Sequence, residues 1–121
     1  DHLQYCSEQS IAALAKAGTV ATLLPGTSLY TGIPYANARK FLDQGCYVSL
    51  ASDFNPGSCV IDNLPFIASL GALHCGLSAP QALTAITWHA AKSLDLAKSK
   101  GALAIGRSNY HRNNQCINKS F

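Results

Sequence analysis

Methionine is absent from this sequence of 121 residues, which opens directly on Asp1-His2-Leu3. We therefore expect a chain that has been processed or cut from a longer one. The sequence also lacks any apolar run near the roughly 18 residues that a membrane span needs, and its N-terminus lacks the basic-then-apolar order of a signal sequence. These absences predict a protein with no membrane partner.

Charge is scarce as well. Charged residues make up 12% of the chain and hydrophobic residues 48%, a balance that excludes wholesale disorder. Of the nine Lys and Arg residues, Arg107, Arg112 and Lys119 follow residue 106, so the six that remain balance the six Asp and Glu residues. The net charge of +3 therefore belongs to the last fifteen residues. With a neutral body, no nucleic-acid partner is predicted.

Paired cysteines are missing too. The five cysteines form an odd, widely spaced set without a C-x-x-C pair, namely Cys6, Cys46, Cys59, Cys75 and Cys116. A zinc ribbon or a disulfide framework needs closer, paired spacing. We therefore expect reduced cysteines, most of them buried as small apolar side chains, in an intracellular, cytoplasmic protein.

Helix and strand signals alternate in the first half of the chain, and helix signals dominate the second. Ser7 and Gly18 are residues that begin and end a helix, and Ser78 to Gln81 has the S-x-x-Q form of a capping box. The expected elements are a helix over 8–17, a strand over 19–24, a loop over 25–35, a helix over 36–44, a strand over 47–51, helices over 64–73 and 78–91, and a short strand over 101–106.

This order is typical of parallel βα units, so the sequence predicts an α/β fold. Two strands cannot make a free-standing parallel sheet, because each such strand needs cover and neighbours. We therefore expect an incomplete fold over residues 1–106. The Asn-rich residues 107–121 have no periodicity and are expected to form a divergent, disordered tail.

Two places are candidates for chemistry, because functional groups of parallel α/β folds gather where strands end. Asp53 directly follows the second strand, and His2 lies where an earlier strand would end. Each has a simpler interpretation: an Asp before Asn-Pro-Gly is often a turn former, and a histidine near a chain end is often solvated. The other histidines, at positions 74, 89 and 111, are expected to be structural or exposed.

Four stretches carry a resemblance to a known family. They are Asp1-His2-Leu3 with Tyr5, GTVATLLPG over 18–26, Ala38-Arg39-Lys40 and, most specifically, SLASDFNPGS over 49–58. From residue 1 to about residue 107 the chain resembles the imidazolonepropionases, which are metal-dependent hydrolases of the amidohydrolase superfamily. The resemblance implies the C-terminal part of a (β/α)8 TIM-like barrel, from the end of strand six through strand eight and into the C-terminal helices.

The resemblance also assigns roles to residues. Asp53 matches the aspartate of strand eight, which binds the metal and accepts a proton from the attacking water. His2 matches the strand-six histidine near the reacting carbonyl, a catalytic or substrate-orienting group. Asn55, Gly57 and Ser58 match the loop that contacts the substrate.

The implied activity is the hydrolysis of 4-imidazolone-5-propanoate to N-formimidoyl-L-glutamate in histidine degradation, with one divalent metal, zinc or iron. It implies a small-molecule substrate and a homodimer of the full-length enzyme. The other metal-binding histidines of the family have no counterpart here, so this chain alone is expected to be inactive. Two alternatives stay open: a part of another amidohydrolase, such as a deaminase or a cyclic-amide hydrolase, and a non-catalytic truncated product.

Overall fold

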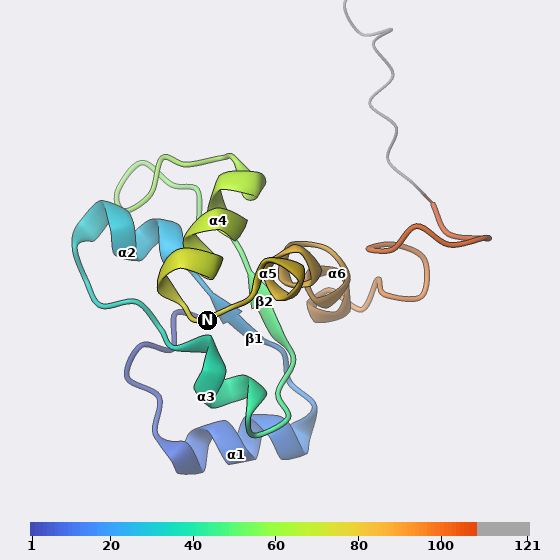
Figure 1. Cartoon of the computed structure of the whole chain (residues 1–121), viewed down its shortest axis with the longest axis horizontal. Helices are drawn as coiled ribbons and strands as arrows, with labels where there is room; N and C mark the ends of the chain where they lie inside the picture. Colours follow the sequence, from blue (N-terminus) through green and yellow to red (C-terminus); the bar gives the residue numbers. More distant parts are fainter. Residues whose placement is uncertain (109–121) are drawn as a thin grey trace, which may run out of the picture.

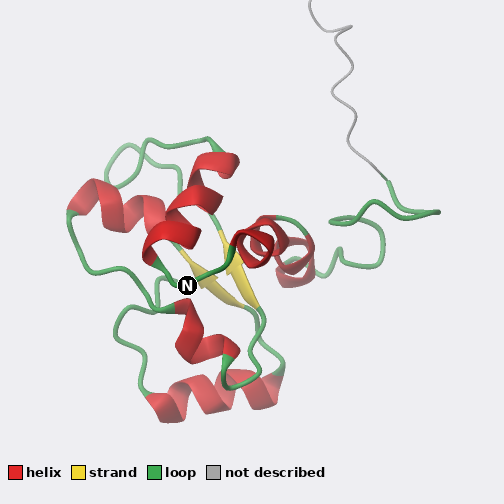
Figure 2. Ribbon diagram, in the orientation of Figure 1, coloured by secondary structure: helices red, strands yellow, loops and turns green. Residues whose placement is uncertain are grey.

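A parallel sheet of two short strands lies at the centre of the computed structural model, which describes residues 1–108 (Figures 1 and 2). The strands β1 (Ala21–Leu23) and β2 (Val48–Leu50) pair with Thr22 opposite Ser49. Helices surround the sheet, with α1 on one side and α4, α5 and α6 on others. The predicted α/β fold with parallel strands is therefore confirmed, although both strands are shorter than expected.

The first helix, α1 (Glu8–Ala17), has the ends that its sequence predicts. The hydroxyl of Ser7 accepts a hydrogen bond from the backbone N–H of Ser10 at 3.2 Å. Gly18 ends the helix with a φ of 67°, a left-handed conformation that glycine adopts without steric cost. Between these caps, Ile11 is buried and packs α1 against the core.

The segment predicted as a loop over 25–35 instead begins with a helix, α2 (Pro25–Thr31). Pro25 stands at the start of the helix, where its missing N–H costs nothing, and Gly32 ends it in the left-handed conformation. The first four residues of α2 are buried, so packing rather than helix propensity stabilises it. A short helix, α3 (Ala38–Leu42), follows and is capped by the side chain of Asn37.

Three helices follow β2: α4 (Leu64–His74), α5 (Ala79–Ile86) and α6 (Trp88–Ser93). The predicted capping box is present, because Ser78 and Gln81 each bond the backbone N–H of the other. The prediction of a single helix over 78–91 is wrong, because two helices occupy this range. Its path breaks at Thr87, which has φ −120° and ψ −89° and whose hydroxyl donates to the carbonyl of Leu83 at 2.7 Å.

The strand expected over 101–106 is also wrong, because these residues form bends and turns. Gly101 and Gly106, at its two ends, have φ values of 84° and 80°, which an extended strand does not accommodate. Arg107, next to the last described residue, donates a hydrogen bond from Nη1 to the carbonyl of Ala97 at 2.6 Å. The predicted domain boundary after residue 106 stays a prediction, and residues 109–121 of the expected tail lie outside the described residues.

The core lies between the sheet and the helices, and its largest buried side chains include Phe41, Ile11, Leu23 and Ile67. Helix α4 packs closely on β2, since a side chain at Gly71 would overlap that of Leu50. Within the sheet, Ser49 is only 1% exposed and its hydroxyl is satisfied by that of Thr22 at 2.8 Å. Among the described residues, no helix has the length and apolar character needed to cross a bilayer.

Candidate functional site

Asp53 lies just beyond the C-terminal end of β2, where the sequence predicted a functional carboxylate. Its side chain is half-buried, and its Oδ2 accepts a hydrogen bond of 2.8 Å from the hydroxyl of Thr27. The backbone of Asp53 has a φ of 52°, in the left-handed region. A residue other than glycine adopts this conformation at a cost on the order of 1 kcal/mol or more, and such residues gather at functional sites.

Helix α2 carries Thr27 to this carboxylate by a close approach to the loop after β2. A Cβ added at Gly26 would lie 2.8 Å from Cys59 Sγ, 2.8 Å from Ile67 Cδ1 and 3.4 Å from the carbonyl oxygen of Ser52. Any larger residue at this position would therefore require the side chains of Cys59 and Ile67 to shift. The next residue, Thr27, is only 4% exposed and faces Asp53.

The loop after Asp53 is organised by the side chain of Asn55. Asn55 Oδ1 accepts from the backbone N–H groups of Gly57 at 2.9 Å and Ser58 at 2.8 Å. Asn55 Nδ2 donates to the carbonyl of Asp53 at 2.6 Å and to the hydroxyl of Ser58 at 2.9 Å. Asn55, rather than Asp53, is thus the turn former of this segment.

These bonds use both donors and both lone pairs of the Asn55 amide. A direct contact of Asn55 with a substrate would therefore have to replace one of these hydrogen bonds. Gly57 is exposed and Ser58 is half-buried, so the rim of the loop offers backbone and hydroxyl groups. The structure brings Asp53, Asn55, Gly57 and Ser58 together in one loop, and their substrate contacts stay a prediction.

His2 lies in the segment before α1, half-buried and with a φ of 63°. This segment reaches α2 through Gln4, whose Nε2 donates to Ser28 Oγ at 3.4 Å. Because the neighbouring Thr27 bonds Asp53, α2 lies between the two predicted parts of the site. Among the described residues no hydrogen bond joins His2 to Asp53 directly.

A divalent metal needs several ligands, and Asp53 is the described residue that the sequence predicts as one of them. The bond from Thr27 engages Oδ2, and Asp53 also has a second carboxylate oxygen, Oδ1. Within residues 1–108 no group of three or more His, Cys, Asp or Glu side chains is close enough to hold a metal ion. The donor set therefore fits a contribution of one oxygen ligand to a site that needs further ligands.

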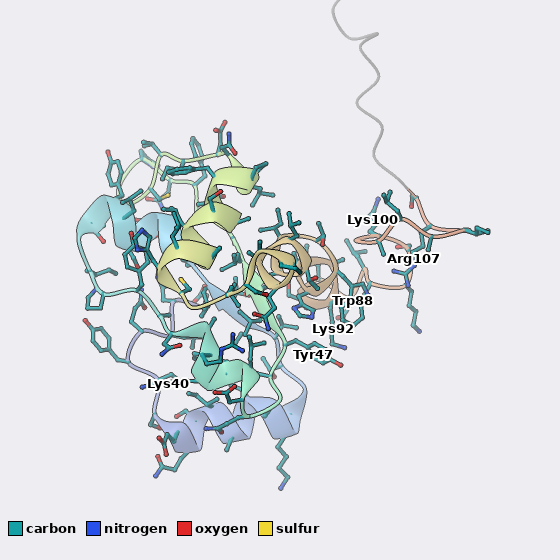
Figure 3. The ribbon with its side chains drawn as sticks, in the orientation of Figure 1. Lys40, Tyr47, Trp88, Lys92, Lys100 and Arg107 are labelled. Atoms are coloured by element: carbon teal, nitrogen blue, oxygen red, sulfur yellow. The ribbon has the colours of Figure 1, made fainter. Side chains whose placement is uncertain are left out.

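A second group of side chains gathers at the other end of β2, around Tyr47 (Figure 3). Lys92 Nζ lies 4.4 Å from the centre of the Tyr47 ring, and the rings of Tyr47 and Trp88 meet edge to face at 5.8 Å. His89 Nδ1 bonds the carbonyl of Val48 at 2.8 Å. This group joins α6 to the start of β2, so His89 has the structural role expected for it.

The cysteines stand apart from the site chemistry. Cys6, Cys46, Cys59 and Cys75 are free, and the last three are buried, as predicted, while Cys116 lies outside the described residues. Burial raises the pKa of the Cys75 thiol to about 11. Burial, and secondarily the nearby Cys6, also raises the pKa of Cys46. These two thiols are therefore protonated and unreactive near neutral pH.

Sequence reasoning missed Thr27, because it placed residues 25–35 in a loop. Proline at the start and glycine at position 32, just past the end, were the signals that favour a helix here. Neither signal shows that the hydroxyl meets a carboxylate 26 residues further along the chain. That contact follows from the packing of α2 against α4 and the loop.

Comparisons with known proteins show the family to which this chain belongs. The model of the Amidohydrolase family matches residues 1–108. The imidazolonepropionase of Symbiobacterium thermophilum is 44% identical over 108 residues, which cover 88% of this chain and 25% of the relative. That of Bacteroides fragilis is 42% identical over 107 residues, with 88% and 26% covered.

The fold has a counterpart among solved structures. The structure of E. coli guanine deaminase matches with a TM-score of 0.73 at 23% sequence identity, covering 88% of this chain and 26% of that one. The chain thus spans about a quarter of the length of the relatives that it matches. On the match of the family model to residues 1–108, the chain belongs to the amidohydrolase family.

Proposed function

We propose that this chain carries one part of the active site of an imidazolonepropionase, namely the metal-binding aspartate and the substrate loop. The observation that supports it is Asp53, a carboxylate that follows a parallel strand, has a strained backbone and is fixed by a buried hydroxyl. Relatives at 42% to 44% identity bear that name. On this proposal, β1 and β2 correspond to strands seven and eight of the barrel.

In the proposed reaction, one carboxylate oxygen of Asp53 binds the divalent metal, zinc or iron. The metal supplies Lewis acidity, which makes a water molecule a stronger acid and polarises a carbonyl. The oxygen of the water attacks the ring carbonyl of 4-imidazolone-5-propanoate, and Asp53 accepts the proton that the water loses. The C–N bond of the ring then breaks, and the proton passes to the leaving nitrogen, which yields N-formimidoyl-L-glutamate.

The other predicted residues have supporting roles. His2 orients the reacting carbonyl, and the rim of the loop at Gly57 and Ser58 contacts the substrate. Asn55 holds that loop in shape through its own hydrogen bonds. A cytoplasmic location and a homodimer of the full-length enzyme stay predictions.

A graft tests the proposal. Residues 1–108 would replace the matching quarter of the Symbiobacterium thermophilum enzyme, and hydrolysis of 4-imidazolone-5-propanoate would be followed by absorbance. We expect turnover, and a loss of about 100-fold or more in kcat when Asp53→Asn removes the proton acceptor. Asp62→Asn, at an exposed carboxylate of the same connection, is the matched control and should leave kcat unchanged.

The chain of 121 residues by itself should show no turnover with added Zn²⁺ or Fe²⁺, because Asp53 is the one metal ligand that the proposal assigns within residues 1–108. Turnover by the chain alone that Asp53→Asn abolishes would contradict this expectation. A folded graft that hydrolyses guanine instead of the imidazolone would favour the deaminase alternative. A folded graft that hydrolyses neither compound would contradict the proposed function.

A further inference from the structure

We propose that Thr27 is a positioning residue that holds the carboxylate of Asp53 in one orientation, with Oδ2 turned to α2 and Oδ1 free to bind a ligand. This inference rests on the proposed role of Asp53. It assigns a function to a helix that the sequence did not predict, and to a residue outside the motif that follows β2.

The contact itself has the properties of an orienting bond. Thr27 Oγ1 donates to Asp53 Oδ2 at 2.8 Å, and Thr27 is almost fully buried at 4% exposure. A hydrogen bond to an ionised carboxylate is stronger than one between neutral groups, and partial exclusion of water strengthens it further. The hydroxyl donates a single proton, so it engages one carboxylate oxygen only.

The backbone of Asp53 does not fix the orientation of its carboxylate. Asn55 Nδ2 donates to the carbonyl of Asp53 at 2.6 Å and stabilises the left-handed backbone there. Rotation remains about χ1, which directs the whole carboxylate, and about the intrinsically broad terminal torsion, which turns its two oxygens. The bond from Thr27 restricts that rotation, so backbone and side chain are held from two different elements.

The residue that supplies the hydroxyl is itself rigid. Thr27 is β-branched, which limits its χ1 rotamers within a helix. Gly26 allows the first turn of α2 to approach Cys59 and Ile67 more closely than any larger residue could. The position of the donor is therefore set by backbone packing and does not depend on a flexible side chain.

Thr27→Val tests the inference, because valine has nearly the shape of threonine but no hydroxyl. In the full chain of 121 residues, the three-bond couplings of the Asp53 carboxyl carbon to its backbone nitrogen and carbonyl carbon report χ1. We expect a single rotamer in the native chain and in Thr27→Ser, and averaged couplings in Thr27→Val. Thr84→Val is the matched control, since this threonine of α5 donates its hydroxyl only to the backbone carbonyl of Pro80, at 2.9 Å, away from Thr27 and Asp53.

Kinetics in the graft described above measure the consequence for catalysis. Thr27→Val should lower kcat by about 10- to 100-fold, the usual effect of a misplaced catalytic group. KM should change by less than about threefold, because substrate binding does not use this bond. Thr27→Ser should restore kcat to within about threefold of the native graft.

The outcomes separate the two proposals. Averaged Asp53 couplings in the native chain, or couplings that Thr27→Val leaves unchanged, overturn the positioning role whatever the graft does. An inactive graft with Thr27 intact contradicts the proposed function, and the couplings alone then decide the role of Thr27. If Thr27→Val does not fold, Thr27→Ala removes the same hydroxyl with less crowding and is judged by the same couplings.

Discussion

Replacing Gly26 with alanine should destabilise the fold by forcing α2 away from the loop that follows β2. The added Cβ would lie 2.8 Å from Cys59 Sγ and 2.8 Å from Ile67 Cδ1, both of which belong to fully buried side chains. Favourable contacts between such atoms begin near about 3.5 Å, so each neighbour must retreat by about 0.7 Å. Overpacking of this kind costs about 1–3 kcal/mol.

A compensating term acts in the opposite direction. Alanine is favoured over glycine in a helix interior by up to about 1 kcal/mol, and by less in the first turn where Gly26 lies. We therefore expect Gly26→Ala to lower the free energy of unfolding by about 1–2 kcal/mol. For a domain of this size, each kcal/mol corresponds to a decrease in Tm of about 3–6 °C.

Urea unfolding measures this effect through the single tryptophan, Trp88, which is half-buried against Tyr47. Gly57→Ala is the control: its Cβ would contact only Asn55 Oδ1 at 3.4 Å, so its effect should stay within about 0.5 kcal/mol. In Gly26→Ala combined with Cys59→Ala, part of the strain should disappear. Equal stability of Gly26→Ala and the native chain, or strict additivity with Cys59→Ala, would refute the close-packing argument.

Three further predictions concern other parts of the chain. Burial raises the pKa of the Cys75 thiol to about 11, above the value of about 9 for a free thiol. The contribution of Cys75 to the free energy of unfolding should therefore be fully present below about pH 9 and should be lost as the pH rises to 11. The urea midpoints measured at pH 8 and pH 10 should differ less in Cys75→Ala than in the native chain. Ser78→Ala removes the hydroxyl that accepts from the backbone N–H of Gln81, keeps the backbone N–H that donates to Gln81 Oε1, and should cost about 1 kcal/mol in thermal unfolding followed by circular dichroism. Asn55→Ala should accelerate amide exchange at Ser58 while exchange in β2 stays unchanged; unaltered protection of that amide would contradict the role of Asn55 in the loop.

The sequence predicts best where structure depends on local chemistry. Ser7, Gly18 and the capping box at Ser78 satisfy backbone groups within a few residues of themselves, and all three act as expected. The position of Asp53 at a strand end follows from the alternation of elements, which is also a local signal. These features need no knowledge of the rest of the fold.

The failures arise where distant contacts decide. Gly26 argues against a helix by propensity, and α2 forms because its buried first turn packs against α4 and the loop. The break at Thr87 divides a continuous apolar pattern between α5, which packs on both α4 and β2, and α6, which packs on β2 but not closely on α4. The bond from Thr27 to Asp53 has no sequence signature, since its partners meet only after these helices are in place.

The bond between His89 and Val48 has a consequence for the edge of the sheet. The carbonyl of Tyr47 accepts a hydrogen bond from the N–H of Ala21 in β1 at 2.8 Å, and carbonyls alternate along a strand, so that of Val48 points to the opposite edge of β2. At that edge, Nδ1 of His89 forms a hydrogen bond of 2.8 Å with the carbonyl oxygen of Val48. A strand that pairs with this edge, as strand one would in the proposed barrel, must share the carbonyl of Val48 with His89 or pass that residue without a bond to it. One histidine thereby restricts the register in which another strand can pair with this edge of β2.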